Sequence, residues 1–288
     1  MIPGFLKRTF QILTLPCWAL ISLGFVPMTA AAQGNLIDAP LPHSTGQSVS
    51  PSFEGWYPNS DGSFSLVFGY FNRNYEENVA VPIGHDNQFE PGPADRGQPT
   101  YFHPRRHTGV FAVKVPADFG NQQLSWRITA GNESIAIPGH LKPEWEITAL
   151  EEITSGNTPP AVRFSESGNS AQGPFGISSP TINTQPGEET EISLWSIDDG
   201  VKKSRAVGQR ARTGVVISKF RGPGDVVIDN DTPRLVNNKA STTATFSIPG
   251  DYVLRVLAWD DSGNQSAIMA GGFFCCWTNG YIKVKVDE

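Results

Sequence analysis

The chain has 288 residues, with 22 Lys and Arg against 28 Asp and Glu, and a formal net charge of −6. This acidic balance argues against nucleic acid or an anionic membrane as the main partner, because both require a concentrated basic surface. The 29 glycines and 23 prolines, and the lack of long helix-period stretches, exclude a helical bundle and are typical of an all-β protein.

The first 32 residues have the features of a secretory signal peptide. Lys7 and Arg8 precede a mostly apolar run over residues 10–26, and three alanines then offer a cleavage site, which we place after Ala32. The apolar run is bracketed by prolines and is shorter than the ~20 residues of a membrane-spanning helix. We therefore expect a secreted or periplasmic mature chain without a membrane span. Loss of Lys7 and Arg8 leaves it with 20 basic and 28 acidic side chains.

Residues 33–52 are rich in Pro, Ser and Gly and predict a flexible lead-in. Residues 53–154 then predict a β-rich domain that we assign to no family. Its expected strands span residues 63–71, 78–83, 109–115, 124–130, 134–137 and 144–148. The intervening residues 84–107 lack a strand pattern, and loops of that length are usually functional or disordered.

A second boundary is expected at residues 155–160, where Gly, Asn, Thr and two prolines meet. Residues 160–288 then predict a Greek-key β-sandwich, because short strands alternate with turn residues. The expected strands span residues 161–164, 190–197, 215–218, 226–228, 244–248, 252–259 and 281–286. Arg255 shares a strand face with its apolar neighbours at 253 and 257, which predicts that this face reaches solvent in part.

Four segments of the second half carry a family resemblance. They are residues 187–194, 198–200, 217–226 with a Gly-Pro-Gly turn, and 244–261, where a Phe leads into a Pro-Gly turn and a Tyr-Val-Leu strand. Over about residues 180–288 the chain resembles the PKD-type and related immunoglobulin-like repeats of cell-surface proteins. The resemblance implies a binding, spacing or adhesion unit. The expected architecture is two β-sandwich domains, of which the C-terminal one is immunoglobulin-like (PKD-like).

Cys275 and Cys276 are adjacent and are the only thiols left after the signal peptide is removed. Oxidising compartments favour their pairing, although neighbouring Cα atoms on a trans chain are closer than in most disulfides. A vicinal disulfide would form a rigid apolar surface beside Trp277, suited to a flat ligand such as a sugar ring. Two unpaired cysteines and a soft-metal site are the alternatives.

Residues 101–107, at the end of the long loop, form a second candidate binding surface. The residues concerned are Tyr101, Phe102, His103, Arg105, Arg106 and His107. Arginine side chains beside aromatic rings and imidazoles suit an anionic or sugar ligand, or the carboxylate-bearing face of a partner. A solvated loop tip is the alternative.

Two sets of residues could bind a metal. His85, His103 and His107 would bind zinc or copper if they converged, as in an accessory metalloprotein or enzyme subunit. Asp260 and Asp261, in one of several Asp-rich turns, are the best calcium ligands. We favour no metal, because arginines flank the imidazoles and Asp is an ordinary turn residue.

The sequence lacks a nucleophile-elbow serine motif, a zinc-protease motif and a phosphate-binding glycine loop. We therefore predict an exported, non-catalytic binding protein without a cofactor. It would contact a protein partner or a glycan through residues 84–107 and 275–277. An accessory metalloprotein and a structural cell-envelope spacer are the alternative functions.

Overall fold

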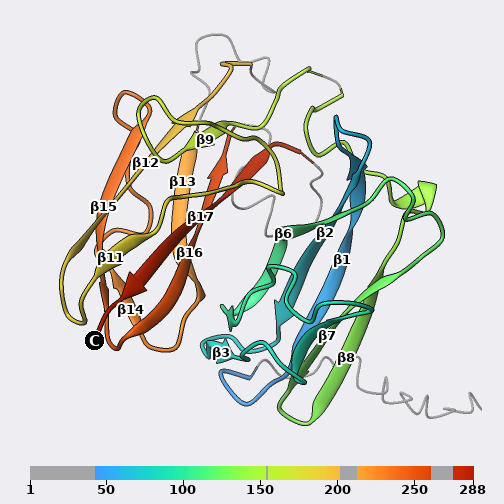
Figure 1. Ribbon diagram of the computed structural model, residues 1–288, viewed down its shortest axis with the longest axis horizontal. Coiled ribbons are helices and arrows are strands. Elements are labelled where there is room, and N and C mark those ends of the chain that lie inside the picture. The colour runs from blue at the N-terminus through green and yellow to red at the C-terminus, as the bar shows by residue number, and fades with distance from the viewer. Residues whose placement is uncertain (1–42, 154, 202–212, 261–274) are drawn as a thin grey trace, which may run out of the picture. The chain divides into compact units, whose positions relative to one another are not determined.

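The computed structural model describes residues 43–153, 155–201, 213–260 and 275–288. The expected signal peptide lies outside these residues, as does the first half of the expected lead-in, residues 33–42. The described elements are β-strands apart from one 3-10 turn, η1 (Pro143–Trp145), which confirms the all-β prediction (Figure 1). We call residues 43–153 the N-terminal half and residues 155–288 the C-terminal half; both belong to one compact unit.

None of the helical segments found in the described residues has the length and apolar character required to span a membrane.

The N-terminal half is a sandwich of two antiparallel sheets. The first has the order β1 (Val49–Pro58), β2 (Phe64–Asn72), β6 (Arg105–Val115), and the second β4 (Asn87–Glu90), β7 (Leu124–Ala130), β8 (Glu133–Gly139). Alternate side chains of both sheets form one buried core, which includes Leu66, Phe68, Phe111, Phe89, Trp126 and Ile128. The short strands β3 (Val79–Ala80) and β5 (Tyr101–Phe102) pair beside it.

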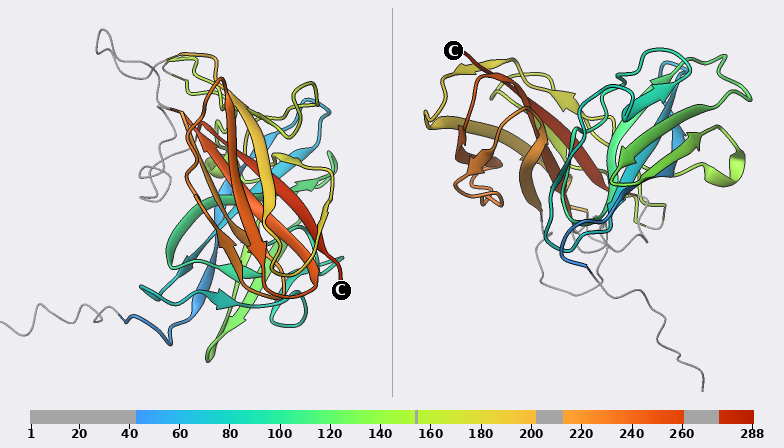
Figure 2. Two further views of the ribbon diagram at one scale, coloured as in Figure 1. Left: turned by 90° about the vertical axis from the view of Figure 1, so that its left-hand side faces the viewer. Right: turned by 90° about the horizontal axis from the view of Figure 1, so that it is seen from below.

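The C-terminal half is a second sandwich, and Figure 2 shows it from two further sides. One sheet has the order β10 (Ile177–Ser178), β17 (Trp277–Val286), β16 (Gly250–Trp259), β13 (Gly214–Arg221), with β11 (Ile182–Thr184) also on β17. The other has the order β14 (Val226–Ile228), β15 (Lys239–Phe246), β12 (Thr190–Ile197), β9 (Ala161–Arg163). Their inner faces share a core that includes Ile192, Leu194, Leu254 and Ile282.

Three expectations for the N-terminal half are wrong. Strand β1 begins at Val49, inside the expected lead-in. Burial alternates along it through the buried Pro51, and the register shifts after Phe53. No strand forms at residues 144–148: the turn η1, with Pro143 at its first position, occupies residues 143–145, and Glu146 makes only an isolated bridge with Trp56. Residues 84–107 are not one loop, since they contain β4, β5 and the start of β6.

The expectation that Arg255 reaches solvent is also wrong. The side chain is 7% exposed, and its face of β16 packs against the N-terminal half. Its Nε donates to Asn279 Oδ1 at 2.9 Å, and its Nη2 donates to the Gly109 carbonyl at 3.2 Å. The guanidinium is therefore part of the contact between the two halves.

The Gly109 carbonyl is the centre of this contact. It accepts hydrogen bonds from Trp277 Nε1 at 3.0 Å and Asn279 Nδ2 at 2.9 Å, as well as from Arg255. We call these four residues the Gly109 joint. Gly109 lies where the β2–β6 register shifts, which turns its carbonyl out of the ladder. Its φ is +55°, and a Cβ there would overlap the Trp277 ring, so only glycine fits.

Replacing Gly109 by Ala should therefore lower the free energy of unfolding by about 3 kcal/mol or more, from backbone strain and overpacking together. The matched control is Gly131→Ala, where φ is +61° but a Cβ would meet nothing within 4 Å. It should lose only the backbone contribution of about 1 kcal/mol. Urea unfolding measures both, and equal losses would contradict the close approach of Trp277.

Candidate functional site

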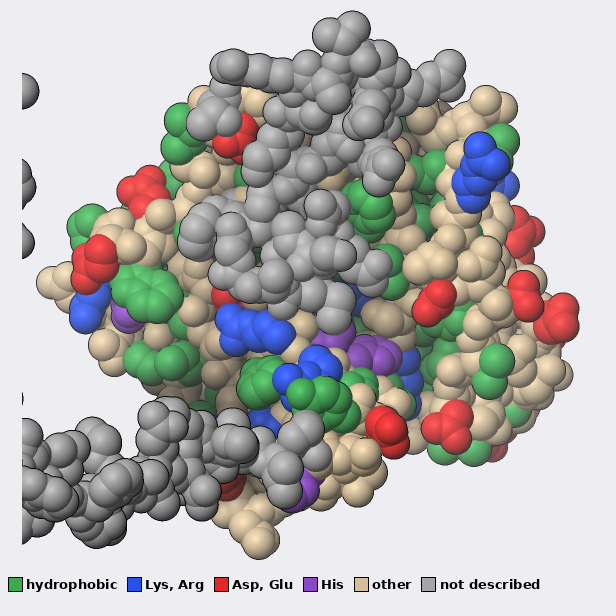
Figure 3. All heavy atoms as spheres, turned by 180° about the vertical axis from the view of Figure 1, so that it is seen from behind, with side chains coloured by type: hydrophobic (Ala, Val, Ile, Leu, Met, Phe, Trp, Pro, Cys, Tyr) green, Lys and Arg blue, Asp and Glu red, His purple; other side chains and the backbone are tan. Residues whose placement is uncertain are grey.

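A cleft of about 520 Å³ is lined by residues of both halves. Its described polar lining includes Tyr101, His103, His107, Lys219, Asp225, Asp229, Asp231 and Arg255. Figure 3 shows histidine side chains beside Lys and Arg side chains near the middle of one face. The cleft thus offers cations, carboxylates, imidazoles and an aromatic ring within the size range of ligand pockets.

Backbone carbonyls hold both imidazoles of the cleft. His103 Nε2 lies 2.8 Å from the Lys219 carbonyl, in the other half, and His107 Nε2 lies 3.0 Å from the Pro104 carbonyl. A carbonyl only accepts, so Nε2 carries the proton in each ring. The His107 ring also stacks on Tyr70, with centroids 4.9 Å apart. Both rings are thereby fixed in one orientation.

Both imidazoles are neutral near pH 7. Burial, with smaller contributions from the neighbouring His103 and Arg255, lowers the pKa of His107 to about 3. Burial also lowers the pKa of His103. The cations of the cleft are therefore Arg255 and Lys219, whose own pKa is lowered by burial.

Lys219 links the glycine-rich turn after β13 to the aromatic side of the cleft. Its Nζ donates to the Gly224 carbonyl at 2.7 Å and lies 4.1 Å from the centroid of the Tyr101 ring. A hydrogen bond to a buried tyrosine also fixes the turn: the Gly224 amide donates to Tyr252 Oη at 3.1 Å. A Cβ on Gly222, at φ +136°, would overlap the Tyr252 ring, so the tight turn requires glycine.

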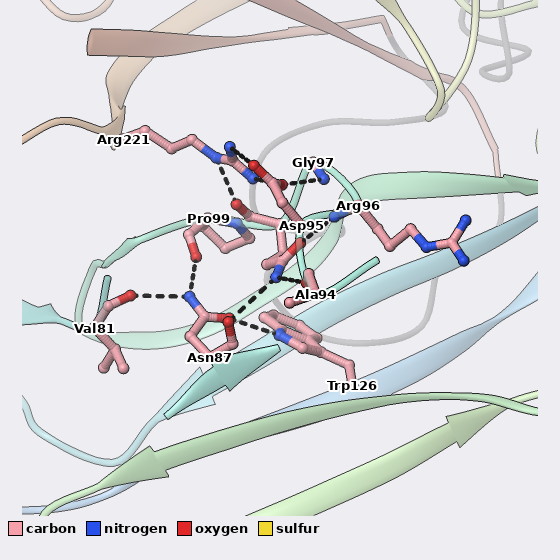
Figure 4. A network of polar contacts seen from close by, with 10 residues as sticks. Val81, Asn87, Ala94, Asp95, Arg96, Gly97, Pro99, Trp126 and Arg221 are labelled. Carbon is pink, nitrogen blue, oxygen red and sulfur yellow. Dashed lines mark hydrogen bonds and ion pairs between the residues drawn. The ribbon is translucent and has the colours of Figure 1, made fainter. Parts of the chain in front are cut away.

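Residues 84–107 are held from the inside by buried amides (Figure 4). Asn87 Nδ2 donates to the Val81 carbonyl at 2.9 Å and the Pro99 carbonyl at 2.7 Å, and Trp126 Nε1 donates to Asn87 Oδ1 at 3.0 Å. Gln98 Nε2 donates to the Ala94 carbonyl at 2.8 Å. These amides replace the ladder hydrogen bonds that the segment lacks.

The same segment is clamped to the C-terminal half. Arg221 forms a two-pronged ion pair with Asp95, at 3.0 and 2.7 Å, and its Nε donates to the Gln98 carbonyl at 2.7 Å. The Thr100 amide donates to the Phe220 carbonyl at 3.1 Å. Part of the surface expected to meet a partner is thus used within the chain.

The structure divides the residues expected at positions 101–107. Tyr101, His103 and His107 line the cleft together. Phe102 is fully buried in the core. Arg106 pairs with Glu54 at 2.7 Å.

Arg105 lies apart from the cleft lining and has a φ of +71°. Its guanidinium stacks on Tyr75, 3.9 Å from the ring centroid, and lies 5.0 Å from that of Phe71. Its charge is therefore directed to the aromatic pair rather than to the ligand surface expected from the sequence.

Cys275 and Cys276 are joined by a disulfide. Their exposed fractions are 3% and 0%, and Trp277 is 3% exposed. Cys276 Sγ lies 3.3 Å from the Asn157 carbonyl, and the Trp277 indole donates to the Gly109 carbonyl. The expected apolar contact surface beside Trp277 is therefore buried.

No group of three or more His, Cys, Asp or Glu side chains that could hold a metal occurs within the described ranges. The rings of His103 and His107 lie 6.0 Å apart, whereas His85 is exposed and pairs with Asp86 at 3.2 Å. Asp260 is buried, and Asp261 lies outside the described residues.

Sequence reasoning missed Lys219 and Arg255 as lining residues. Arg255 carried a usable signal, since a lone Arg in the apolar strand 252–259 is buried only when its donors find partners. The sequence around Lys219 carried no such signal, because the position of Lys219 in the cleft depends on how β13 packs against the N-terminal half.

No family model matches the chain, and no curated protein matches it. Among solved structures, the chain is similar to domains 4 and 5 of the S-layer protein SbsC, with a TM-score of 0.24, 11% identity, and coverage of 84% of this chain and 98% of that one. A chimeric titin Z1Z2 with an exogenous KLER peptide from decorin gives a TM-score of 0.24, 10% identity, and coverage of 84% and 99%. Similarities this weak define neither a family nor a function.

Acid should destabilise the protein through His107. The unfolded imidazole ionises near pH 6.5, whereas the folded pKa is about 3. Below pH 6.5 the unfolded state therefore binds a proton that the folded state does not, and stability falls as pH decreases. His107→Phe keeps the ring stack and should reduce the loss between pH 7 and pH 5 by about 1 to 2 kcal/mol in urea unfolding. An unchanged profile for His107→Phe would refute the assignment.

The buried disulfide makes a second prediction. Protein isolated from an oxidising compartment should have an intact mass two hydrogens below that of the reduced form. Iodoacetamide should label neither sulfur until the chain is unfolded and reduced, because both are inaccessible in the folded state. Labelling of the native protein without reductant would show free thiols.

Proposed function

We propose that this chain is an exported, non-catalytic binding protein whose cleft holds a hydroxyl-rich ligand, such as a sugar unit of a glycan. The observation that carries the proposal is the composition of the cleft: the Tyr101 ring, the cations Lys219 and Arg255, and the carboxylates at 225, 229 and 231 all line one cavity of about 520 Å³.

A sugar requires this mixture of groups. Each hydroxyl both donates and accepts, so a sugar site needs carboxylate acceptors and N–H donors on the same surface. An aromatic ring supplies the flat apolar face on which the C–H side of a pyranose can pack. A simple anion would be repelled by the three carboxylates, and a flat protein surface would not enter a cavity of this size.

The imidazoles support binding over catalysis. Each directs its Nε2 proton to a backbone carbonyl, and each is neutral because burial lowers its pKa. A general base must instead face the proton of a nucleophile. The features of a signal peptide and the disulfide agree with a role outside the cytoplasm.

A glycan array followed by calorimetry with the best-binding oligosaccharide tests this function. Tyr101→Ala should weaken binding at least tenfold, because the stacking face is lost. Tyr75→Ala is the matched control, since Tyr75 is 49% exposed and lies outside the cleft lining. It should leave the affinity unchanged.

Failure of every glycan to bind would remove the proposal and favour the structural spacer, which needs no small ligand. Equal affinity of Tyr101→Ala and the wild-type chain would show that a bound glycan occupies another surface.

A further inference from the structure

A second cavity, of about 330 Å³, shares no described lining residue with the cleft. Residues of both halves line it, with Phe111 from β6 and Phe220, Val253 and Tyr281 from β13, β16 and β17. The rings of Phe220 and Tyr281 pack with centroids 5.4 Å apart. The lining is therefore largely apolar and aromatic, unlike that of the cleft.

One wall of this cavity is preformed. Phe175, which is 47% exposed, and Ile177 flank Gly176 in that wall. Gly176 has a φ of +70°, and a Cβ there would overlap the carbonyl of Asn279, so the wall lies directly on β17. Ile177 then pairs with Gly280 as a parallel strand. Because the backbone under this exposed aromatic side chain is already fixed, a ligand that packs on it loses little free energy to the ordering of the protein.

The charges around the cavity are of one sign. Arg96, Arg221 and Lys283 line it, and no carboxylate belongs to its described lining. Arg221 is engaged by Asp95. Neither Arg96 nor Lys283 takes part in the ion pairs found among the described residues. Two cations of the lining are thus left without a charged partner there.

Arg96 is positioned to receive a ligand. Its backbone amide is fixed by Gln98 Oε1 at 2.8 Å, whereas its side chain points away from that polar network (Figure 4). Its Nε is buried and has no hydrogen-bond partner within the described residues, and its Nη2 makes only a long contact, 3.5 Å, with the Pro91 carbonyl. A buried guanidinium N–H without an acceptor is unfavourable, and an anion would satisfy it.

We propose that this cavity binds a small organic anion with an apolar body, of the class of aromatic or aliphatic carboxylates. The carboxylate lies between Arg96 and Lys283, and the apolar body packs on Phe220 and Phe175. This site is separate from the sugar cleft and takes a ligand of different chemistry.

Calorimetry on the full chain with 1-naphthoate tests the proposal, with the neutral 1-naphthalenemethanol as the matched ligand. Naphthoate should bind with one-to-one stoichiometry, and the alcohol at least tenfold more weakly. Arg96→Gln and Lys283→Gln should each weaken naphthoate binding by about tenfold, the effect of one charge-assisted hydrogen bond.

Lys285→Gln is the control variant. Lys285 lies two residues further along β17, is exposed, and is outside the cavity lining. It should bind naphthoate like the wild-type chain. Equal affinity for acid and alcohol, or wild-type affinity in both cavity variants, would overturn the proposal. Because these ligands lack a sugar's hydroxyl pattern, neither result bears on the glycan cleft.

Discussion

The contact between the two halves depends on one backbone carbonyl. Gly109 presents it from a bulge in β6, and donors from Arg255, Trp277 and Asn279 converge on it from β16 and β17. A carbonyl has two lone pairs, so three donors exceed its ideal capacity and concentrate positive potential there. The arrangement is specific because it requires a residue without a side chain at one position and three side chains with N–H donors opposite it.

Burial of the Arg255 guanidinium is an electrostatic constraint on how the two halves meet. The described hydrogen bonds of this cation go to an amide and a carbonyl oxygen rather than to a carboxylate, and burial lowers its pKa. Breaking such a contact is strongly unfavourable, whereas its net contribution to stability is small, so its role is to define how the halves dock. Cavities lined by both halves keep their shape only while that docking holds.

The sequence predicted the strands well where buried and exposed side chains alternate regularly along the chain. Residues 190–197 alternate with period two, and the strand observed there has the same bounds. Strand β1 was missed because Pro51 and a register shift hide its alternation. Of the cleft, residues 101, 103 and 107 were predicted from their chemistry. Lys219 and Arg255 were not predicted, because a local sequence pattern does not indicate which distant strands will pack against each other.

The position of β17 in the chain affects how the protein can mature. This strand pairs with β16 along its whole length, receives β10 and β11 on its other edge, and supplies two donors to the Gly109 joint. It is also the last described strand to be synthesised. Until it emerges, β16 keeps an open edge, and the N-terminal sandwich lacks the surface on which it docks. The native contacts of β17 therefore form last and over long sequence separations, a topology that folds slowly.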